Sequence, residues 1–293
     1  MRGPDSDEAM GDFLAELGLP GIVDAHVHFL PDALQEAVWR WFDRLSPPWP
    51  VTYRASPTDR LATLGRLGVR HHTALAYAHR PRILGYLNDH TMALAAREPS
   101  VIPTFMIYPE PGVTAETSRR LAEGGACVKV HLQVGGFDPT DRLLEETWAL
   151  LEEASTPVVL HAGAVEDGSG NEQWCGPDRV RRLLERHPGL RLVVAHLGAP
   201  DYDDFVELAT DHRSVWLDTA MVFTDPPHLG PAPGHLVGRL EALGERVVFE
   251  SDFPTIPHRY AAQVRGLVES GFSEDWLRAV LWTNGRRLFG LAD

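Results

Sequence analysis

Residues 22–28 read Ile-Val-Asp-Ala-His-Val-His, an apolar stretch that ends in two histidines two positions apart. Isoleucine and valine favour a β-strand, in which residues i and i+2 point to the same side. The spacing therefore predicts that His26 and His28 share one face, where their imidazoles could bind one metal ion. A strand that carries two histidines without a metal is the alternative, and the rest of the sequence has to decide between the two.

The composition is that of a globular protein, with 44% hydrophobic and 23% charged residues in a chain of 293. The formal net charge of -14 argues against a nucleic-acid-binding surface. Residues 1–20 contain several acidic side chains and no long apolar run, so we expect neither a secretory signal nor a membrane anchor. Two cysteines, Cys127 and Cys175, do not make a disulfide framework, and we expect a reducing, cytoplasmic location.

Helical and strand patterns alternate along the chain, and about eight apolar segments read as strands that are followed by helices. Short apolar runs such as residues 158–160 and 192–194 fit parallel strands that are buried on both faces. The pattern predicts an α/β protein with a (β/α)8 TIM barrel. An open doubly wound sheet is the alternative, but the sequence has no Gly-rich phosphate loop to go with it. The predicted strands cover residues 22–28, 69–77, 101–107, 127–132, 157–161, 190–196, 214–219 and 247–251.

We expect one domain over residues 1–293, with an N-terminal extension at 1–20 and a helical tail at 274–289. Residues 29–56 are rich in aromatic residues and proline, and they read as an insertion after the first strand. These aromatic side chains have to pack on something. The insertion therefore either covers the end of that strand or contacts a second subunit in a homodimer, and packing within the chain is the simpler interpretation.

Polar residues occur at the ends of the predicted strands, which is where a barrel of this kind builds its active site. They are His26, His28, Tyr77, His79, Tyr108, Lys129, His131, His161, His196, Thr219 and Asp252. Because strand eight of a barrel closes against strand one, Asp252 should lie beside His26 and His28. With His161 these side chains form an N,N,N,O set that suits Zn²⁺, with Mn²⁺ or Fe²⁺ as alternatives and a coordination position left for water.

Four short motifs at strand ends resemble those of the amidohydrolase superfamily: His26-Val27-His28, His161-Ala162-Gly163, His196-Leu197-Gly198 and Ser251-Asp252-Phe253-Pro254. More narrowly, they are similar to the amidohydrolase-related branch that includes aminocarboxymuconate-semialdehyde decarboxylase and 2-pyrone dicarboxylate lactonase. The resemblance runs from about residue 21 to the C-terminus. It implies that His26, His28, His161 and Asp252 bind the metal. It also implies that His196 lies near the metal-bound water as a base or polarising group. Asp252 could be ligand and proton acceptor at once.

Lys129 and Glu250 bear on the number of metal ions. In binuclear relatives a lysine of strand four is carboxylated and bridges two metals, and the histidines of strands five and six bind the second ion. In the branch that this chain resembles, one metal is usual and the lysine contacts substrate, which is what we expect of Lys129. Glu250 stands where many members have glycine; it faces the same side as Asp252, so its carboxylate needs a cation or donors.

Other polar residues are candidates for substrate contacts. His131 continues the face of Lys129 and either binds substrate or is structural. Together with Tyr77 and His79, Lys129 and His131 could meet an anionic group, so the small-molecule substrate could carry a carboxylate. The loop at residues 165–176 is long enough to help form a pocket, with Trp174 as its candidate contact. Asp24 also faces inward, and we interpret it as a buried hydrogen-bonding partner.

The sequence thus predicts a hydrolase in which metal-activated water attacks a carbonyl carbon of an amide, lactone or ester. Non-oxidative decarboxylation of a small aromatic or unsaturated acid, a lyase reaction, is the alternative on the same residues. A barrel that binds metal without turnover is the third reading, and an open coordination position argues against it.

Overall fold

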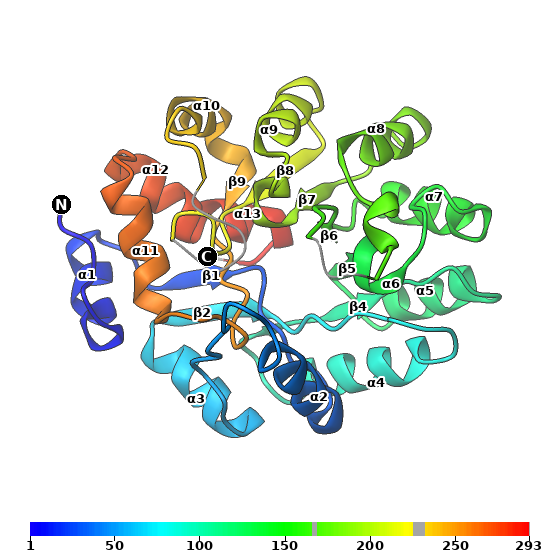
Figure 1. Cartoon of the computed structure of the whole chain (residues 1–293), viewed down its shortest axis with the longest axis horizontal. Coiled ribbons are helices and arrows are strands. Elements are labelled where there is room, and N and C mark those ends of the chain that lie inside the picture. The colour runs from blue at the N-terminus through cyan, green and yellow to red at the C-terminus, as the bar shows by residue number, and fades with distance from the viewer. Residues whose placement is uncertain (166–168, 225–231, 293) are drawn as a thin grey trace. The chain divides into compact units, whose positions relative to one another are not determined.

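The computed structural model describes residues 1–165, 169–224 and 232–292. The chain divides into two compact units: the first comprises Met1–Thr73 with Thr219–Asp293, and the second comprises Ala74–Asp218. Helices and strands alternate in both units, as the coloured path of the chain shows (Figure 1). None of the described helices is both long and apolar enough to cross a membrane.

In the first unit, the first and last strands of the chain lie side by side. β1 (Ile22–Asp24) pairs in parallel with β2 (Val69–Thr73) on one side. On its other side, the N–H of Ala25 donates to the carbonyl of Phe249 (3.2 Å), directly after β9 (Val247–Val248). A parallel bridge joins Val27 to Phe253 further along. The last strand, β9, therefore lies next to the first strand, β1, as the barrel prediction requires.

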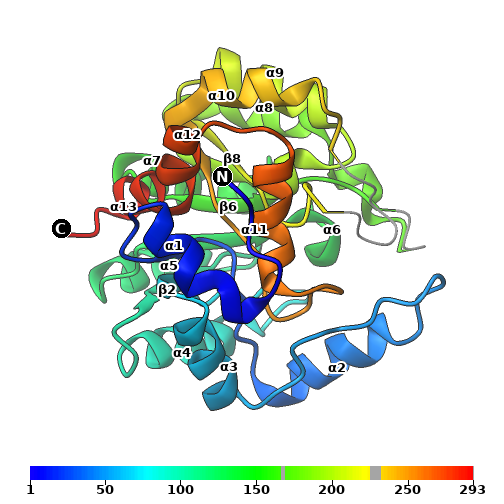
Figure 2. The same cartoon turned by 90° about the vertical axis from the view of Figure 1, so that its left-hand side faces the viewer.

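The helices of the first unit include α2, which lies within the predicted insertion. Figure 2 shows α2 and the loop after it extending away from α3. The start of α3 follows from local sequence, because Ser56 accepts a hydrogen bond from the N–H of Asp59 and Pro57 occupies the first turn. The bounds are α1 (Met10–Glu16), α2 (Asp32–Phe42), α3 (Pro57–Arg66), α10 (Leu236–Leu243), α11 (Tyr260–Glu269), α12 (Glu274–Arg278) and α13 (Asn284–Phe289).

In the second unit, β4 to β8 pair side by side in sequence order, all in parallel. The apolar runs at residues 158–160 and 192–194 are fully buried, as parallel central strands should be. The strands are β3 (Val101–Ile102), β4 (Thr104–Met106), β5 (Cys127–His131), β6 (Val158–His161), β7 (Leu192–Val194) and β8 (Val215–Asp218). The α-helices are α4 (Leu84–Ala95), α5 (Val113–Ala122), α6 (Leu132–Gly135), α7 (Glu145–Glu153), α8 (Pro177–Arg186) and α9 (Tyr202–Asp211).

The predicted alternation of parallel strands and helices is confirmed, with strands that are shorter than expected. The predicted tail at residues 274–289 is helical and consists of α12, a π-helical turn at Ala279–Thr283 and α13. Helix α11, between β9 and that tail, was not predicted. Residues 166–168 of the predicted pocket loop lie outside the described residues. The expectation of a single domain stays a prediction.

Candidate active site

His26 and His28 follow β1, which ends at Asp24. Between them, Val27 is fully buried and its N–H donates to the hydroxyl of Thr73 (3.1 Å). The two imidazoles therefore point to the side opposite Val27, as the spacing predicts. Their Nε2 atoms are 3.1 Å apart, and the rings meet at an interplanar angle of 65°.

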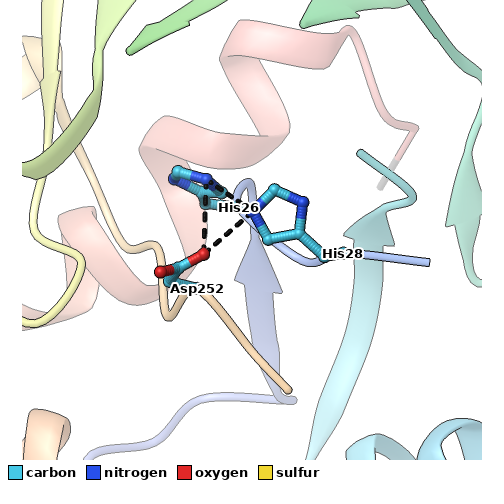
Figure 3. A group of neighbouring side chains, drawn as sticks. All are labelled: His26, His28 and Asp252. Atoms are coloured by element: carbon cyan, nitrogen blue, oxygen red, sulfur yellow. Dashed lines mark hydrogen bonds and ion pairs between the residues drawn. The ribbon is translucent and has the colours of Figure 1, made fainter. Parts of the chain in front are cut away.

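Asp252 faces both histidines from the loop after β9 (Figure 3). Its Oδ1 lies 2.9 Å from Nε2 of His28 and 3.6 Å from Nε2 of His26. The backbone of Asp252 has a φ of 61°, a left-handed conformation that costs a non-glycine residue roughly 1–2 kcal/mol. It is held there partly by the N–H of Asp252, which donates to the carbonyl of His26 (2.8 Å). Such strain clusters at functional sites.

The three donor atoms have the spacing of ligands around one small cation. Two ligands about 2.05 Å from a tetrahedral ion are about 3.3 Å apart. The observed separations of 2.9, 3.1 and 3.6 Å bracket that value. All three atoms lie within 4.8 Å of one another, and the two histidines are buried while Asp252 keeps partial access to solvent. Two nitrogens and one carboxylate oxygen suit Zn²⁺, Mn²⁺ or Fe²⁺.

Glu250 lies behind His26. Its fully buried carboxylate places Oε2 3.1 Å from Nδ1 of His26. With a proton on Nδ1 beside this carboxylate, the imidazole would keep the lone pair of Nε2 toward Asp252 and His28. Metal-bound histidines commonly use this arrangement, in which the second nitrogen donates to a carboxylate that orients the ring. The imidazole of His26 thus lies within ion-pair distance of the buried Glu250 carboxylate.

Asp24 is also fully buried, and it is a hydrogen-bonding partner as expected. Its Oδ1 accepts from the N–H groups of His26 (3.2 Å) and Ser251 (3.1 Å), and its Oδ2 accepts from the hydroxyl of Tyr260 (2.7 Å). Burial raises the pKa of Asp24 to about 7, although the hydrogen bonds from Ser251 and Tyr260 lower it. Burial, followed by the charge of Asp24, raises the pKa of Tyr260 well above its ordinary value, so this hydroxyl keeps its proton and donates.

His161, the fourth predicted ligand, belongs to the second unit and lies among other candidate residues there. Its ring stacks on that of His131, with centroids 3.8 Å apart and an angle of 12°. The rings of His196 and His161 are 5.0 Å apart, and Tyr77 lies edge-on to His131 at 5.5 Å. The structure therefore brings four of the predicted residues together in this unit. Lys129, which is only 1% exposed, lies two residues before His131 on β5 and so faces the same side.

His196 also has a left-handed backbone, with a φ of 56°, and it is almost fully buried. Its N–H donates to Oδ1 of the buried Asp218 at the end of β8 (2.7 Å). The glycines two residues after His161 and His196 have steric reasons. A Cβ on Gly163 would lie 1.9 Å from the carbonyl oxygen of Ala199, and Gly198 has a φ of 77°.

Trp174 is the one predicted substrate contact that the described structure does not bring to this histidine cluster. Its ring contacts the guanidinium of Arg179 at 5.3 Å. The sequence argument missed Tyr260 and Asp218, and it quoted Ser251 only as part of a motif. Asp218 carried a signal, because it stands at the end of a predicted strand beside the chosen Thr219.

Comparisons with known proteins agree with this architecture. The family model described as Amidohydrolase matches residues 23–291. An uncharacterised TIM-barrel protein from Bordetella bronchiseptica is 17% identical, with a TM-score of 0.72 over 92% of this chain and 98% of its own. The 5-carboxyvanillate decarboxylase of Sphingomonas paucimobilis is 17% identical, with a TM-score of 0.64 over 93% of this chain and all of its own.

A probable 2-pyrone-4,6-dicarboxylic acid hydrolase from Acinetobacter baumannii, crystallised with citric acid bound, is also similar. It is 17% identical, with a TM-score of 0.64 over 92% of this chain and all of its own. A search of curated proteins gives no match. These likenesses show that the fold is the predicted (β/α)8 barrel. Since the family model spans nearly the whole sequence, this chain belongs to the amidohydrolase family.

Proposed function

We propose that this enzyme is a metal-dependent hydrolase that adds water to a carbonyl carbon of a small, carboxylated organic substrate. The observation that carries the proposal is the meeting of two imidazole nitrogens and one carboxylate oxygen, on His26, His28 and Asp252, at separations of 2.9 to 3.6 Å. A divalent ion held there would lower the pKa of bound water toward neutrality. Zn²⁺ is the ion that we favour, with Mn²⁺ and Fe²⁺ as alternatives. We keep His161 as the predicted fourth ligand.

Asp252 has the position of a proton acceptor. Its Oδ1 faces the two imidazoles, and its side chain keeps 17% of its surface exposed. A carboxylate with this access can take the proton of an attacking water while it still orients the histidines. His196 is the second candidate for that role, as a base or as a polarising group. Its backbone is held by the bond from its N–H to Asp218, and its ring packs edge-on against that of His161.

Lys129, His131 and Tyr77 support a substrate with a negative charge. They lie on one side of the second unit, where a buried ammonium, an imidazole and a phenol can all donate to a carboxylate. Nδ1 of His131 accepts from the N–H of Val134 (3.3 Å), which leaves Nε2 as the nitrogen that donates. The similar decarboxylase and the probable hydrolase are both named for carboxylated ring compounds.

Decarboxylation of a small aromatic or unsaturated acid is the second candidate function. It is favoured by the likeness to 5-carboxyvanillate decarboxylase over the full length of that protein. The same metal ligands and the same anion-binding side chains would serve it. The two candidates differ in their products, because hydrolysis consumes water and opens a bond at a carbonyl carbon, whereas decarboxylation releases carbon dioxide.

The test is turnover by metal-free and reloaded enzyme. Protein stripped with a chelator is reloaded with Zn²⁺, Mn²⁺ or Fe²⁺ and assayed on lactones, amides and carboxylated aromatic acids, with ring opening and carbon dioxide followed together. We expect water addition that depends on the ion and is lost in His28→Ala, but not in His71→Ala, which alters a histidine on β2 away from this group. Carbon dioxide release without ring opening would reject hydrolysis. Equal turnover by stripped protein would reject metal dependence.

A further inference from the structure

We propose that Asp24 and Tyr260 are a positioning pair that holds the backbone segments of His26 and Asp252 at the separation that metal binding requires. The inference rests on the proposed metal centre and deepens it. Asp24 accepts from two backbone N–H groups and from the hydroxyl of Tyr260, so the pair acts through the backbone.

One oxygen of Asp24 joins two segments that are far apart in the sequence. Oδ1 accepts from the N–H of His26 and from the N–H of Ser251, which is 227 residues away from Asp24. The first segment carries the ligand imidazoles, and the second leads directly into Asp252. Both N–H groups belong to buried residues and would cost free energy without an acceptor. One oxygen that accepts both N–H groups fixes the distance between the two backbone segments.

Tyr260 holds the other oxygen of Asp24. Its hydroxyl donates to Oδ2 at 2.7 Å, and the whole residue is buried. Tyr260 is the first residue of α11, and its own N–H donates to the hydroxyl of Tyr53 at 2.7 Å. That hydroxyl in turn donates to Asp7 of the N-terminal extension (2.5 Å), whose other oxygen accepts from the N–H of Ala261. These bonds stabilise the start of α11, whereas the bond that reaches Asp24 is made by the Tyr260 hydroxyl alone among them.

The Asp252 segment needs this support because its backbone is strained. Asp252 has its positive φ between Ser251 and Phe253, and hydrogen bonds hold both neighbours. The carbonyl of Ser251 accepts from the side chain of Gln263 on α11 (2.8 Å), and its hydroxyl accepts from the N–H of Phe253 (3.1 Å). Helix α11 contributes no predicted ligand, yet it supplies two of the side chains that hold this segment. Strained conformations persist only where the surroundings determine them in this way.

Removal of the pair should weaken metal binding more than it weakens the fold. Loss of a residue that orients metal ligands typically costs 10- to 100-fold in metal affinity. The test uses Tyr260→Phe, which removes only the hydroxyl, and Asp24→Asn, which keeps the size of the side chain. The dissociation constant for Zn²⁺ is measured by competition with a chromogenic chelator. The visible absorption of protein loaded with Co²⁺ reports the coordination geometry. We expect 10- to 100-fold weaker Zn²⁺ binding and an altered Co²⁺ spectrum in both variants.

Tyr53→Phe is the matched control, because it removes the hydroxyl that meets the N–H of Tyr260 but leaves the bond between Tyr260 and Asp24. We expect it to lower the thermal midpoint while Zn²⁺ affinity and the Co²⁺ spectrum stay those of the wild type. Equal weakening of Zn²⁺ binding in Tyr53→Phe and Tyr260→Phe would overturn the positioning role in favour of a general loosening of α11. If Asp24→Asn does not fold, Tyr260→Phe alone decides.

Two outcomes separate this inference from the proposed function. If the wild type binds Zn²⁺ and both variants bind it with unchanged affinity and an unchanged Co²⁺ spectrum, the positioning role is wrong and the proposed function stands. If the wild type binds no divalent ion, the proposed function fails and the inference fails with it.

Discussion

Nδ1 of His26 lies 3.1 Å from a carboxylate oxygen of Glu250, a residue that has no exposure to solvent. A histidine oriented in this way presents its other nitrogen with a fixed direction and a raised basicity. The relationship joins a residue that follows the last strand to a candidate ligand that follows the first.

Glu250→Gln should weaken metal binding. The amide places no negative charge beside Nδ1 of His26, so the imidazole is less basic and we expect a 10- to 100-fold loss of Zn²⁺ affinity. Competition with a chelator measures it, and Glu36→Gln on the exposed face of α2 is the control. An unchanged affinity in Glu250→Gln would mean that Glu250 does not act through this histidine.

Asp252→Asn should lower kcat without lowering the thermal midpoint of unfolding. Asparagine tolerates the left-handed backbone at this position, so the thermal midpoint should stay close to that of the wild type. Its amide cannot take a proton from water, so kcat should fall by about 10²- to 10⁴-fold. Asp252→Val is the contrast, because a β-branched residue at this φ should also lower the thermal midpoint. Full activity in Asp252→Asn would show that another group takes the proton.

Gly163→Ala should destabilise the second unit, since its Cβ would lie 1.9 Å from the carbonyl oxygen of Ala199. Overpacking of this kind costs about 1–3 kcal/mol. Gly238→Ala is the matched control, because Gly238 lies in α10 and an added Cβ there meets nothing within 4 Å. That variant should be about 0.5–1 kcal/mol more stable than the wild type. Chemical denaturation measures both, and equal stability of the two variants would contradict the steric argument.

His72 should make the fold sensitive to acid. Burial lowers its pKa to about 4 from an ordinary 6.5, and its Nδ1 donates to the carbonyl of Thr73 at 2.8 Å. An unfolded chain takes up this proton as the pH falls through 6.5, whereas the folded chain does so only near 4. Stability is therefore lost as the pH falls between those values, by about 2 kcal/mol from pH 7 to pH 5.

The measurement is the free energy of unfolding of metal-free protein at pH 7 and pH 5, for the wild type and His72→Asn. The variant lacks the titrating group, so its change between the two pH values should be smaller by about 2 kcal/mol. The same change in both proteins would show that His72 does not contribute.

Much of the barrel could be predicted because its signals are local. Apolar runs such as residues 158–160 and 192–194 mark buried strands wherever they lie in the chain. Helix α11 lacked such signals. It has no side-chain cap at Arg259, and it contains Gly266, a residue that weakens an isolated helix. The structure shows why glycine is there, since a Cβ on Gly266 would lie 1.9 Å from the carbonyl oxygen of Phe223.

The sequence predicted which residues form the candidate site, but it did not predict the hydrogen bonds and backbone conformations that hold them in place. The two-residue spacing of His26 and His28 correctly predicted a shared face, because side chains continue to point to alternate sides of the backbone past the end of β1. The hydrogen bond between Asp24 and Tyr260 joins residues that are 236 positions apart in the sequence, and no local sequence pattern predicts it. The left-handed backbone of Asp252 could not be predicted either, because the residue type aspartate does not determine the φ angle.

The metal content of the purified chain tests the central claim most directly. Protein loaded with Zn²⁺, passed through a desalting column and analysed by elemental mass spectrometry should retain close to one ion per chain. His26→Ala should retain almost none, while it keeps the helical circular dichroism of the wild type. A full complement of tightly held zinc in His26→Ala, or none in the wild type, would contradict the account.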